Sequence, residues 1–202
     1  MGQAIELPPP DREGETSVEE VMDRRRSSRS FEDRPLTTAQ LGQLLWSAGG
    51  VSVDGVSGPT RTAPSAGGLY PIEAYLIVGE AEGIEPGVYH YRWREHELEL
   101  ISSGDVRSSL TRAALGQRAV ADAPCVVVLG ADYSVTRARY GSRGVERYVH
   151  MDAGHAAQNV LLQAEALGLG MTPIGAFSDR AVRELLQIET VPLYLMPVGY
   201  PE

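Results

Sequence analysis

Asp152-Ala-Gly-His-Ala-Ala-Gln-Asn-Val-Leu-Leu-Gln-Ala-Glu-Ala-Leu167 is the stretch that most constrains the fold. Together with the residues from about Val145, it predicts one long helix that ends at Gly168 and Gly170. Its apolar residues occur on nearly all sides, and a helix of that kind lies at the centre of a domain rather than on its surface. The sequence therefore predicts a domain built around a central helix.

Shorter elements are predicted on both sides of this helix. The predicted strands are 73–78, 87–93, 97–101, 124–129, 171–176 and 193–198, and the predicted shorter helices are 17–25, 37–48, 106–115 and 178–186. Residues 51–69 and 130–145 are predicted as long loops, which are often functional. The fold class that follows is α+β, with a mixed or antiparallel sheet flanked by helices.

The size and composition are those of one ordinary domain. The chain has 202 residues, of which 43% are hydrophobic and 22% charged. Residues 1–15 are interpreted as an N-terminal arm, either disordered or packed on a partner subunit, and residues 16–202 as a single domain. The sequence has neither a signal-peptide core nor an apolar run of about 20 residues, so a cytoplasmic protein is expected.

Charge and cysteine content exclude several classes of function. The formal net charge of −9 disfavours nucleic acid and anionic membranes as partners, and all the basic residues are arginines. The single cysteine, Cys125, is predicted to be a buried thiol. His150 and His155 are five residues apart and point to different helix faces, so no metal site is expected.

Three segments are candidates for a ligand site. Arg24-Arg-Arg-Ser-Ser-Arg-Ser30 has the groups to hold a phosphate, although arginines at a helix C-terminus are also ordinary solvated surface. Arg61-Thr-Ala-Pro-Ser-Ala-Gly-Gly-Leu-Tyr-Pro71 is either a turn or a loop whose small residues let the backbone approach a flat ligand. Gly168-Leu-Gly-Met-Thr-Pro-Ile-Gly-Ala-Phe177 departs from the dinucleotide fingerprint at Pro173 and follows a helix, so a Rossmann site is rejected.

A polar set lies on the central helix. Asp152, His155 and Asn159 are three and four residues apart and share one helix face. A buried network that fixes packing is the favoured interpretation of this set.

Taken in order, Arg25-Arg-Ser-Ser-Arg29, Pro64 to Pro71, Asp152 to Asn159 and Gly168 to Phe177 resemble the nitroreductase superfamily, and within it the SagB-type dehydrogenases. The resemblance implies a nitroreductase-like fold and an intertwined homodimer that binds FMN at the subunit interface.

The resemblance also implies roles for individual residues. Arg25 and Ser27 would contact the FMN phosphate, Arg26 would line the same pocket, and Arg29 would approach the pyrimidine edge of the flavin. Pro64, Ser65, Ala66 and Gly67 would lie against the ring from the other subunit. Pro173 and Ile174 would pack on one flavin face, with the amides of Gly175 and Ala176 directed at N5 and O4.

The sequence departs from the pattern in two places. SagB-type azoline dehydrogenases carry a Lys-Tyr pair where Arg139-Tyr140 stands here, and an arginine is not a general base near neutral pH. Azoline oxidation by the usual mechanism is therefore disfavoured, while Tyr140 remains a candidate for proton exchange. Basic phosphate contacts after the final strand are also missing, so phosphate binding is expected to use the first arginine cluster and Arg143 or Arg147.

The resemblance implies an FMN-dependent oxidoreductase that transfers hydride through flavin N5 by a ping-pong mechanism. The expected donor is NAD(P)H and the expected acceptors are quinones or nitroaromatics. Two alternatives stay open: a SagB-type dehydrogenase of a modified peptide or other natural product, and a non-catalytic protein that binds or stores flavin.

Overall fold

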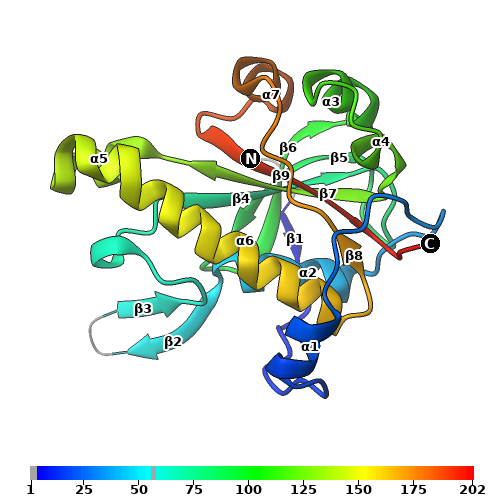
Figure 1. The fold of residues 1–202 in the computed structure, drawn as a ribbon, viewed down its shortest axis with the longest axis horizontal. Helices are drawn as coiled ribbons and strands as arrows, with labels where there is room; N and C mark the ends of the chain where they lie inside the picture. The colour runs from blue at the N-terminus through cyan, green and yellow to red at the C-terminus, as the bar shows by residue number, and fades with distance from the viewer. Residues whose placement is uncertain (1–3, 56–57) are drawn as a thin grey trace.

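The computed structural model describes residues 4–55 and 58–202 (Figure 1). Its main sheet has seven strands in the order β1-β6-β5-β4-β7-β9-β8, and neighbouring strands are antiparallel throughout. The strands are β1 (Ala4–Glu6), β4 (Ile72–Val78), β5 (Gly87–Arg92), β6 (Glu97–Ser103), β7 (Cys125–Ala131), β8 (Gly170–Met171) and β9 (Val191–Gly199). The helices are α1 (Val18–Arg24), α2 (Thr38–Gly49), α3 (Arg107–Ala113), α4 (Ala119–Asp122), α5 (Tyr133–Arg143), α6 (Val149–Ala166) and α7 (Asp179–Leu186). The predicted α+β class is confirmed.

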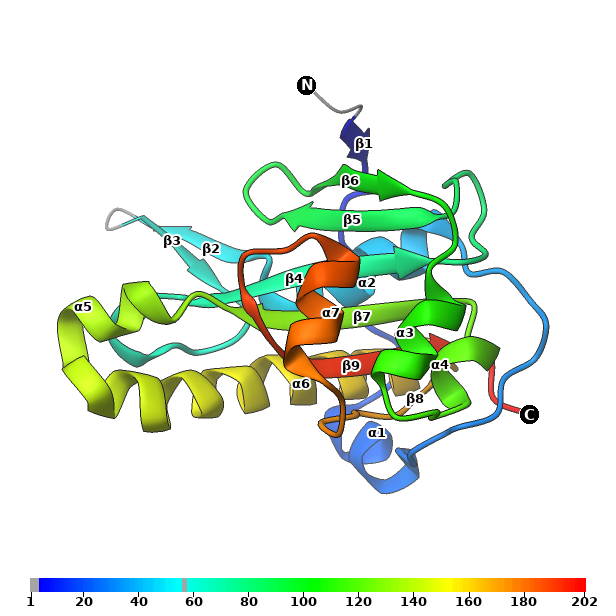
Figure 2. The same ribbon diagram turned by 90° about the horizontal axis from the view of Figure 1, so that it is seen from above.

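Helices cover both faces of this sheet (Figure 2). Side chains alternate along β4, so Leu76 faces one hydrophobic cluster with α2 and α6, while Ile77 faces a second cluster with α3, α4 and α7. Because both faces are buried, the central strands have nearly continuous apolar sequences such as Cys125 to Leu129. The sheet therefore forms the middle layer of three.

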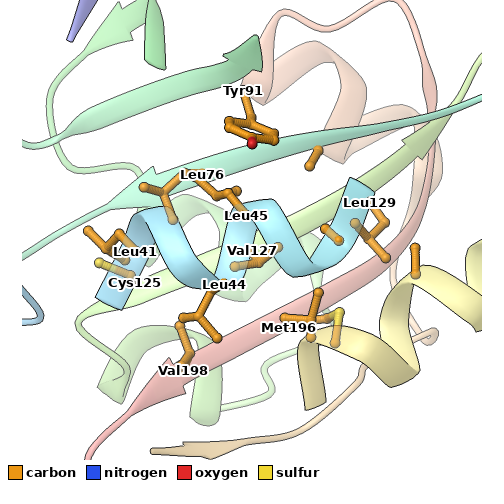
Figure 3. Packing of buried hydrophobic residues seen from close by; sticks show 14 of the residues in the cluster. Leu41, Leu44, Leu45, Leu76, Tyr91, Cys125, Val127, Leu129, Met196 and Val198 are labelled. Carbon is orange, nitrogen blue, oxygen red and sulfur yellow. The ribbon is translucent and has the colours of Figure 1, made fainter. Parts of the chain in front are cut away.

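Helix α2 shows why the first core forms. Thr37 caps it in a reciprocal capping box with Gln40, as its sequence predicts. Leu41, Leu44 and Leu45 are fully buried against the sheet (Figure 3). Burial of each such side chain stabilises the fold by roughly 1.5–3 kcal/mol.

The predicted central helix is present. A π-helical turn at Gly144–Tyr148 leads into α6, so the α-helix itself begins at Val149 rather than at about 145. Ala153, Ala156 and Ala157 are among its buried residues, and α6 packs against both α2 and the sheet.

Several predicted boundaries are wrong. The strand predicted at 171–176 ends at Met171, because Pro173 has no amide hydrogen with which to continue a ladder; beyond it only an isolated bridge joins Ile174 to Leu195. The loop predicted at 130–145 contains α5.

The loop predicted at 51–69 contains a hairpin of β2 (Val51–Gly55) and β3 (Gly58–Arg61), then a 3₁₀ turn, η1 (Ala66–Gly68). Residues 56–57 of this segment lie outside the described residues.

The N-terminal arm contacts its own chain. Strand β1 pairs with β6, Leu7 is buried, and the Asp11 amide donates to Gln43 Oε1 at 2.8 Å. Residues 1–3 lie outside the described part. Among the helices of residues 4–55 and 58–202, none is both long and apolar enough to cross a membrane.

Candidate functional site

Asp152 anchors the small-residue loop to the central helix. Its side chain is 4% exposed and accepts hydrogen bonds from Ser65 Oγ at 2.6 Å and from the Ala66 amide at 3.3 Å. Ser65 Oγ in turn accepts from the Tyr70 amide at 2.8 Å. The hydroxyl of Ser65 and the amide of Ala66 therefore hold the loop in place, and Pro64, Gly67 and Gly68 are its exposed residues.

Two more residues of α6 bind the same loop. His155 Nδ1 donates to the Pro64 carbonyl at 3.2 Å, and Asn159 Nδ2 donates to the Thr62 carbonyl at 3.1 Å. The face shared by Asp152, His155 and Asn159 thus positions the loop through polar contacts. The expectation of a buried network is met only at Asp152, because His155 is exposed and Asn159 is half-buried.

Gly67 presents its bare backbone to Tyr140. Gly67 has φ +63°, and a Cβ added there would overlap the Tyr140 hydroxyl. The Tyr140 ring meets the Tyr148 ring edge-on, with centroids 5.1 Å apart. The structure therefore brings Tyr140 and the small-residue loop together within one chain.

Arg61, which the sequence analysis left without a role, holds the base of this loop. It is 8% exposed, donates through Nε to the Gly49 carbonyl, and lies 4.8 Å and 5.4 Å from the ring centroids of Trp93 and Tyr70. Burial lowers the pKa of Arg61, and nearby Glu73 opposes that shift. The sequence offers no clue to this burial, because Trp93 and the Gly49 carbonyl come from other segments, although Tyr70 belongs to the same loop.

The arginine segment lies at the other end of α6. Arg24 is 3.7 Å from Glu165, and the Ser28 amide donates to the Met171 carbonyl at 3.2 Å. Ser27 also forms a parallel bridge with Met171. These contacts fix the segment beside β8. The order of residues along the chain does not predict this placement.

The side chains of this segment take different directions. Arg25 is half-buried and Arg26 is exposed, with Arg26 Nη1 donating to the Asp23 carbonyl at 2.6 Å. Arg29 lines an open cavity of about 650 Å³ with residues of α4 and Glu202. Within the chain, Arg29 therefore lies toward α4.

Residues 173–176 continue from β8 along the edge of β9. Pro173, Gly175 and Ala176 are exposed, but Ile174 is 5% exposed and packs in the second core cluster. The expectation that the Ile174 side chain packs on a flavin does not match this placement, because alternation along the segment turns it into the core. Exposed backbone at 175–176 remains for a ligand.

The predicted site residues form two groups within one chain. The loop group contacts α6 near Asp152, and the arginine group contacts it near Glu165. The two anchors are thirteen positions apart on the helix, which is about 20 Å at 1.5 Å per residue. Arg143 and Arg147 precede the N-terminus of α6, with the loop group. One chain does not gather all the predicted ligands into one pocket.

The cysteine lies in the core. Burial raises the pKa of the Cys125 thiol to about 12, so the thiol is protonated and inert, as expected of a structural cysteine. In the part of the chain that the structure describes, no group of three or more His, Cys, Asp or Glu side chains is placed to hold a metal ion.

Comparison with known proteins relates this arrangement to one family. The profile of the Nitroreductase family matches residues 22–200. A protein of Methanocaldococcus jannaschii named "Putative nitroreductase MJ1384" is 44% identical over 199 residues, which cover 98% of each chain. The trifolitoxin-processing protein TfxB of Rhizobium leguminosarum bv. trifolii is 30% identical over 136 residues, covering 64% of this chain and 36% of TfxB.

Two crystal structures described as putative nitroreductases have the same fold. One, from Ralstonia eutropha, has a TM-score of 0.85 and 30% identity, covering 98% of this chain and 90% of that one. The other, from Anabaena variabilis, has a TM-score of 0.84 and 32% identity; it covers all of this chain, which spans only 42% of that longer protein.

Proposed function

Because this chain belongs to the nitroreductase family of oxidoreductases, we propose that it is an FMN-dependent enzyme that oxidises NAD(P)H and reduces quinones or nitroaromatics. When bound, FMN would supply a two-electron carrier, taking hydride at N5 from NAD(P)H to leave NAD(P)⁺ and passing it to a quinone that gains a proton to become a hydroquinone. If both substrates bind in turn at the same place, the order of reaction would be ping-pong.

The residues present fit such a cofactor. Arg25 and Ser27 would contact its phosphate and Arg26 would line the same pocket, since a guanidinium matches the geometry of a phosphate. Arg25 and Arg26 form no ion pair with a carboxylate anywhere in residues 4–55 or 58–202, so their charge is free for an anion. Arg29 is assigned to the pyrimidine edge, which requires its side chain to leave the cavity near α4.

The small-residue segments would supply the walls for the flavin ring. Pro64, Ser65, Ala66 and Gly67 form an anchored, low-profile surface on which a flat ring can lie. At the other wall, Pro173 and the main chain at Ile174 would face the ring, and the amides of Gly175 and Ala176 would donate toward N5 and O4. Tyr140, beside Gly67, is assigned to proton exchange with the substrate.

We propose a homodimer because the site is incomplete in one chain. The two groups of assigned residues lie about 20 Å apart along α6. A second copy that crosses this helix would place its own loop group beside the first chain's arginine group. Each FMN would then contact residues of both subunits.

The observation that carries this proposal is the pair of half-buried Arg25 and exposed Arg26, neither ion-paired among the described residues, on a segment that bonds Met171 just before the exposed residues 173, 175 and 176. The first test is the visible spectrum of the purified protein. We expect a flavin spectrum, either as purified or after addition of FMN. A colourless protein that takes up no FMN would refute the cofactor assignment.

Replacement of Arg25 tests the phosphate contact. We expect Arg25→Ala to weaken FMN binding about 10–100-fold, since a hydrogen bond to a charged group contributes roughly 1.5–3 kcal/mol. The matched control is Arg112→Ala, an exposed arginine on α3 whose guanidinium bonds, among the described residues, Ser108 and Ser109. Equal FMN affinity in both variants would remove the role assigned to Arg25.

A second candidate function is a dehydrogenase acting on a modified peptide, as the similarity to trifolitoxin-processing TfxB suggests. Turnover of NADPH with menadione, compared with oxidation of a thiazoline peptide, separates the two. The Arg139-Tyr140 pair favours the first, because Arg139 does not act as a base. A protein that only stores flavin would show no rapid anaerobic reduction by NAD(P)H.

A further inference from the structure

A bent basic arm lies beside the candidate flavin wall. It consists of α5 and the following π-helical turn, residues 133–148, and Figure 1 shows α5 projecting past the edge of the sheet. Gly141 bends the arm with φ +59° and ψ −143°, a conformation reserved for glycine. The bend directly follows Tyr140, whose hydroxyl lies against Gly67.

The charge of the arm is opposite to that of the whole chain. The arm contains four arginines and one acidic residue, whereas the chain carries a net charge of −9. The arginines are Arg137, Arg139, Arg143 and Arg147. No carboxylate of the described residues lies within ion-pair distance of any of them, although Arg24, Arg107 and Arg180 elsewhere are paired.

Two tyrosines hold two of these cations at the surface. The Arg139 guanidinium lies 5.6 Å from the Tyr140 ring centroid, and that of Arg143 lies 5.6 Å from the Tyr148 ring centroid. Arg143 Nε also donates to the Tyr148 hydroxyl at 2.8 Å. Stacking on a ring leaves most guanidinium donors free, so the surface offers both aromatic faces and unpaired N–H groups.

Among the arginines of the arm, Arg139 lies beside Gly67 of the loop. Its Cζ lies 3.4 Å from the position that a Cβ on Gly67 would occupy. This guanidinium and the Tyr140 hydroxyl therefore border the Gly67 backbone, and a planar molecule bound beside this loop would meet them at its rim. In a site that also contains Tyr140, a negatively charged group at the rim of such a molecule would bind the Arg139 guanidinium directly.

We propose that the arm selects substrates carrying an anionic group, a carboxylate, sulfonate or phosphate, and that Arg139 is the residue that binds it. This inference rests on the proposed function, because it names the substrate class of the same site. The anion belongs either to a planar acceptor or to the 2′-phosphate of NADPH. Both anions are recognised in the same way, because their negatively charged oxygens face a planar guanidinium.

The first test measures binding rather than turnover. Calorimetric titration of the FMN-loaded protein compares 1,4-naphthoquinone-2-sulfonate with neutral menadione. We expect the sulfonate to bind more tightly, and Arg139→Gln to lower the ratio of the two affinities about tenfold. Raising the salt concentration from 0.05 M to 0.5 M should reduce the preference in the unsubstituted protein.

The matched controls are Arg112→Gln and Arg139→Lys. Arg112→Gln removes one positive charge from an exposed helix outside the arm and should keep the affinity ratio. Arg139→Lys retains the charge and should restore part of the ratio. Equal affinities for both quinones, or an equal effect of Arg112→Gln, would overturn the acceptor form of the proposal.

The second test identifies the source of the anion. A fall in kcat/KM for NADPH but not for NADH in Arg139→Gln assigns the contact to the nucleotide 2′-phosphate, and a fall confined to the sulfonated quinone assigns it to the acceptor. No selective change in either comparison overturns the proposal. Flavin content and menadione turnover of the unsubstituted protein report separately on the proposed function, so failure of one is distinguished from failure of the other.

Discussion

The hydroxyl of Tyr140 lies against the α-carbon of Gly67, although 73 residues separate them, and no Cβ fits between the two. The loop that contains Gly67 is held from the other side by Asp152. A contact on each side therefore fixes how the bare backbone of the loop is presented.

Substitution of Gly67 should be more costly than substitution of its neighbour. Gly67 and Gly68 have φ of +63° and +65°, so alanine at either is strained by about 1–2 kcal/mol. A Cβ at Gly67 also overlaps the Tyr140 hydroxyl, while one at Gly68 meets nothing within 4 Å. We expect Gly67→Ala to lower the free energy of unfolding by about 1–3 kcal/mol more than Gly68→Ala.

Denaturant unfolding measures this difference. Adding Tyr140→Phe to Gly67→Ala should recover part of the lost stability, because it removes the overlapping oxygen. Equal stabilities of the two alanine variants would show that the contact is absent in solution.

Asp152 and Ser65 should act as one unit. Asp152→Ala leaves the Ser65 hydroxyl and the Ala66 amide without their acceptor, so we expect a loss of about 1–3 kcal/mol in the free energy of unfolding. Ser65→Ala removes part of the same interaction, and the double variant should lose less than the sum of the two single losses. A double-mutant cycle that is strictly additive would contradict the contact.

His96 should make the stability of the fold depend on pH. Its Nε2 donates to the Pro8 carbonyl at 2.9 Å, and its Nδ1 forms a hydrogen bond of 2.8 Å with the Tyr91 hydroxyl. Burial lowers the pKa of His96, with the Pro8 hydrogen bond opposing that shift.

The sign of this dependence follows from the direction of the shift. Below the unfolded pKa of about 6.5, the unfolded chain binds more protons than the folded chain. The stabilisation is complete above that pH and is lost as the pH falls through the folded pKa. Asparagine tolerates the φ of +55° at this position, so His96→Asn is the matched control. Unfolding at pH 7.5 and 5 should show a steeper loss for the unsubstituted protein; equal slopes would count against this role.

Cys125 should be unreactive until the chain unfolds. Its thiol is buried, and burial raises its pKa to about 12, so little thiolate is present or accessible at pH 8. A disulfide reagent should label less than a tenth of the native protein in the time that it labels all of the protein in guanidinium chloride. Complete labelling of the native chain would place Cys125 outside the core.

Local patterns predicted the elements whose cause is local. Ser17, Thr37 and Ser178 are the N-caps of α1, α2 and α7, because a cap needs only its own turn of helix. The wrong prediction of a strand at 171–176 also has a local cause, because Pro173 interrupts the hydrogen-bond ladder. In the sequence, the apolar residues around Pro173 favoured a strand and outweighed the signal of the proline. Helix α5 was missed because its polar sequence carries no apolar periodicity.

By itself, the sequence determined the α+β class, the central helix, the apolar strands and the inert thiol, since periodicity and composition encode burial directly. It also contained the small-residue loop and the arginine segment. Only the tertiary structure decided how they are held: Asp152 anchors the loop, Arg61 is buried beneath it, and the two groups lie at opposite ends of α6. Those relationships join residues far apart in the chain, and the spacing of residues along a sequence does not encode which distant segments meet.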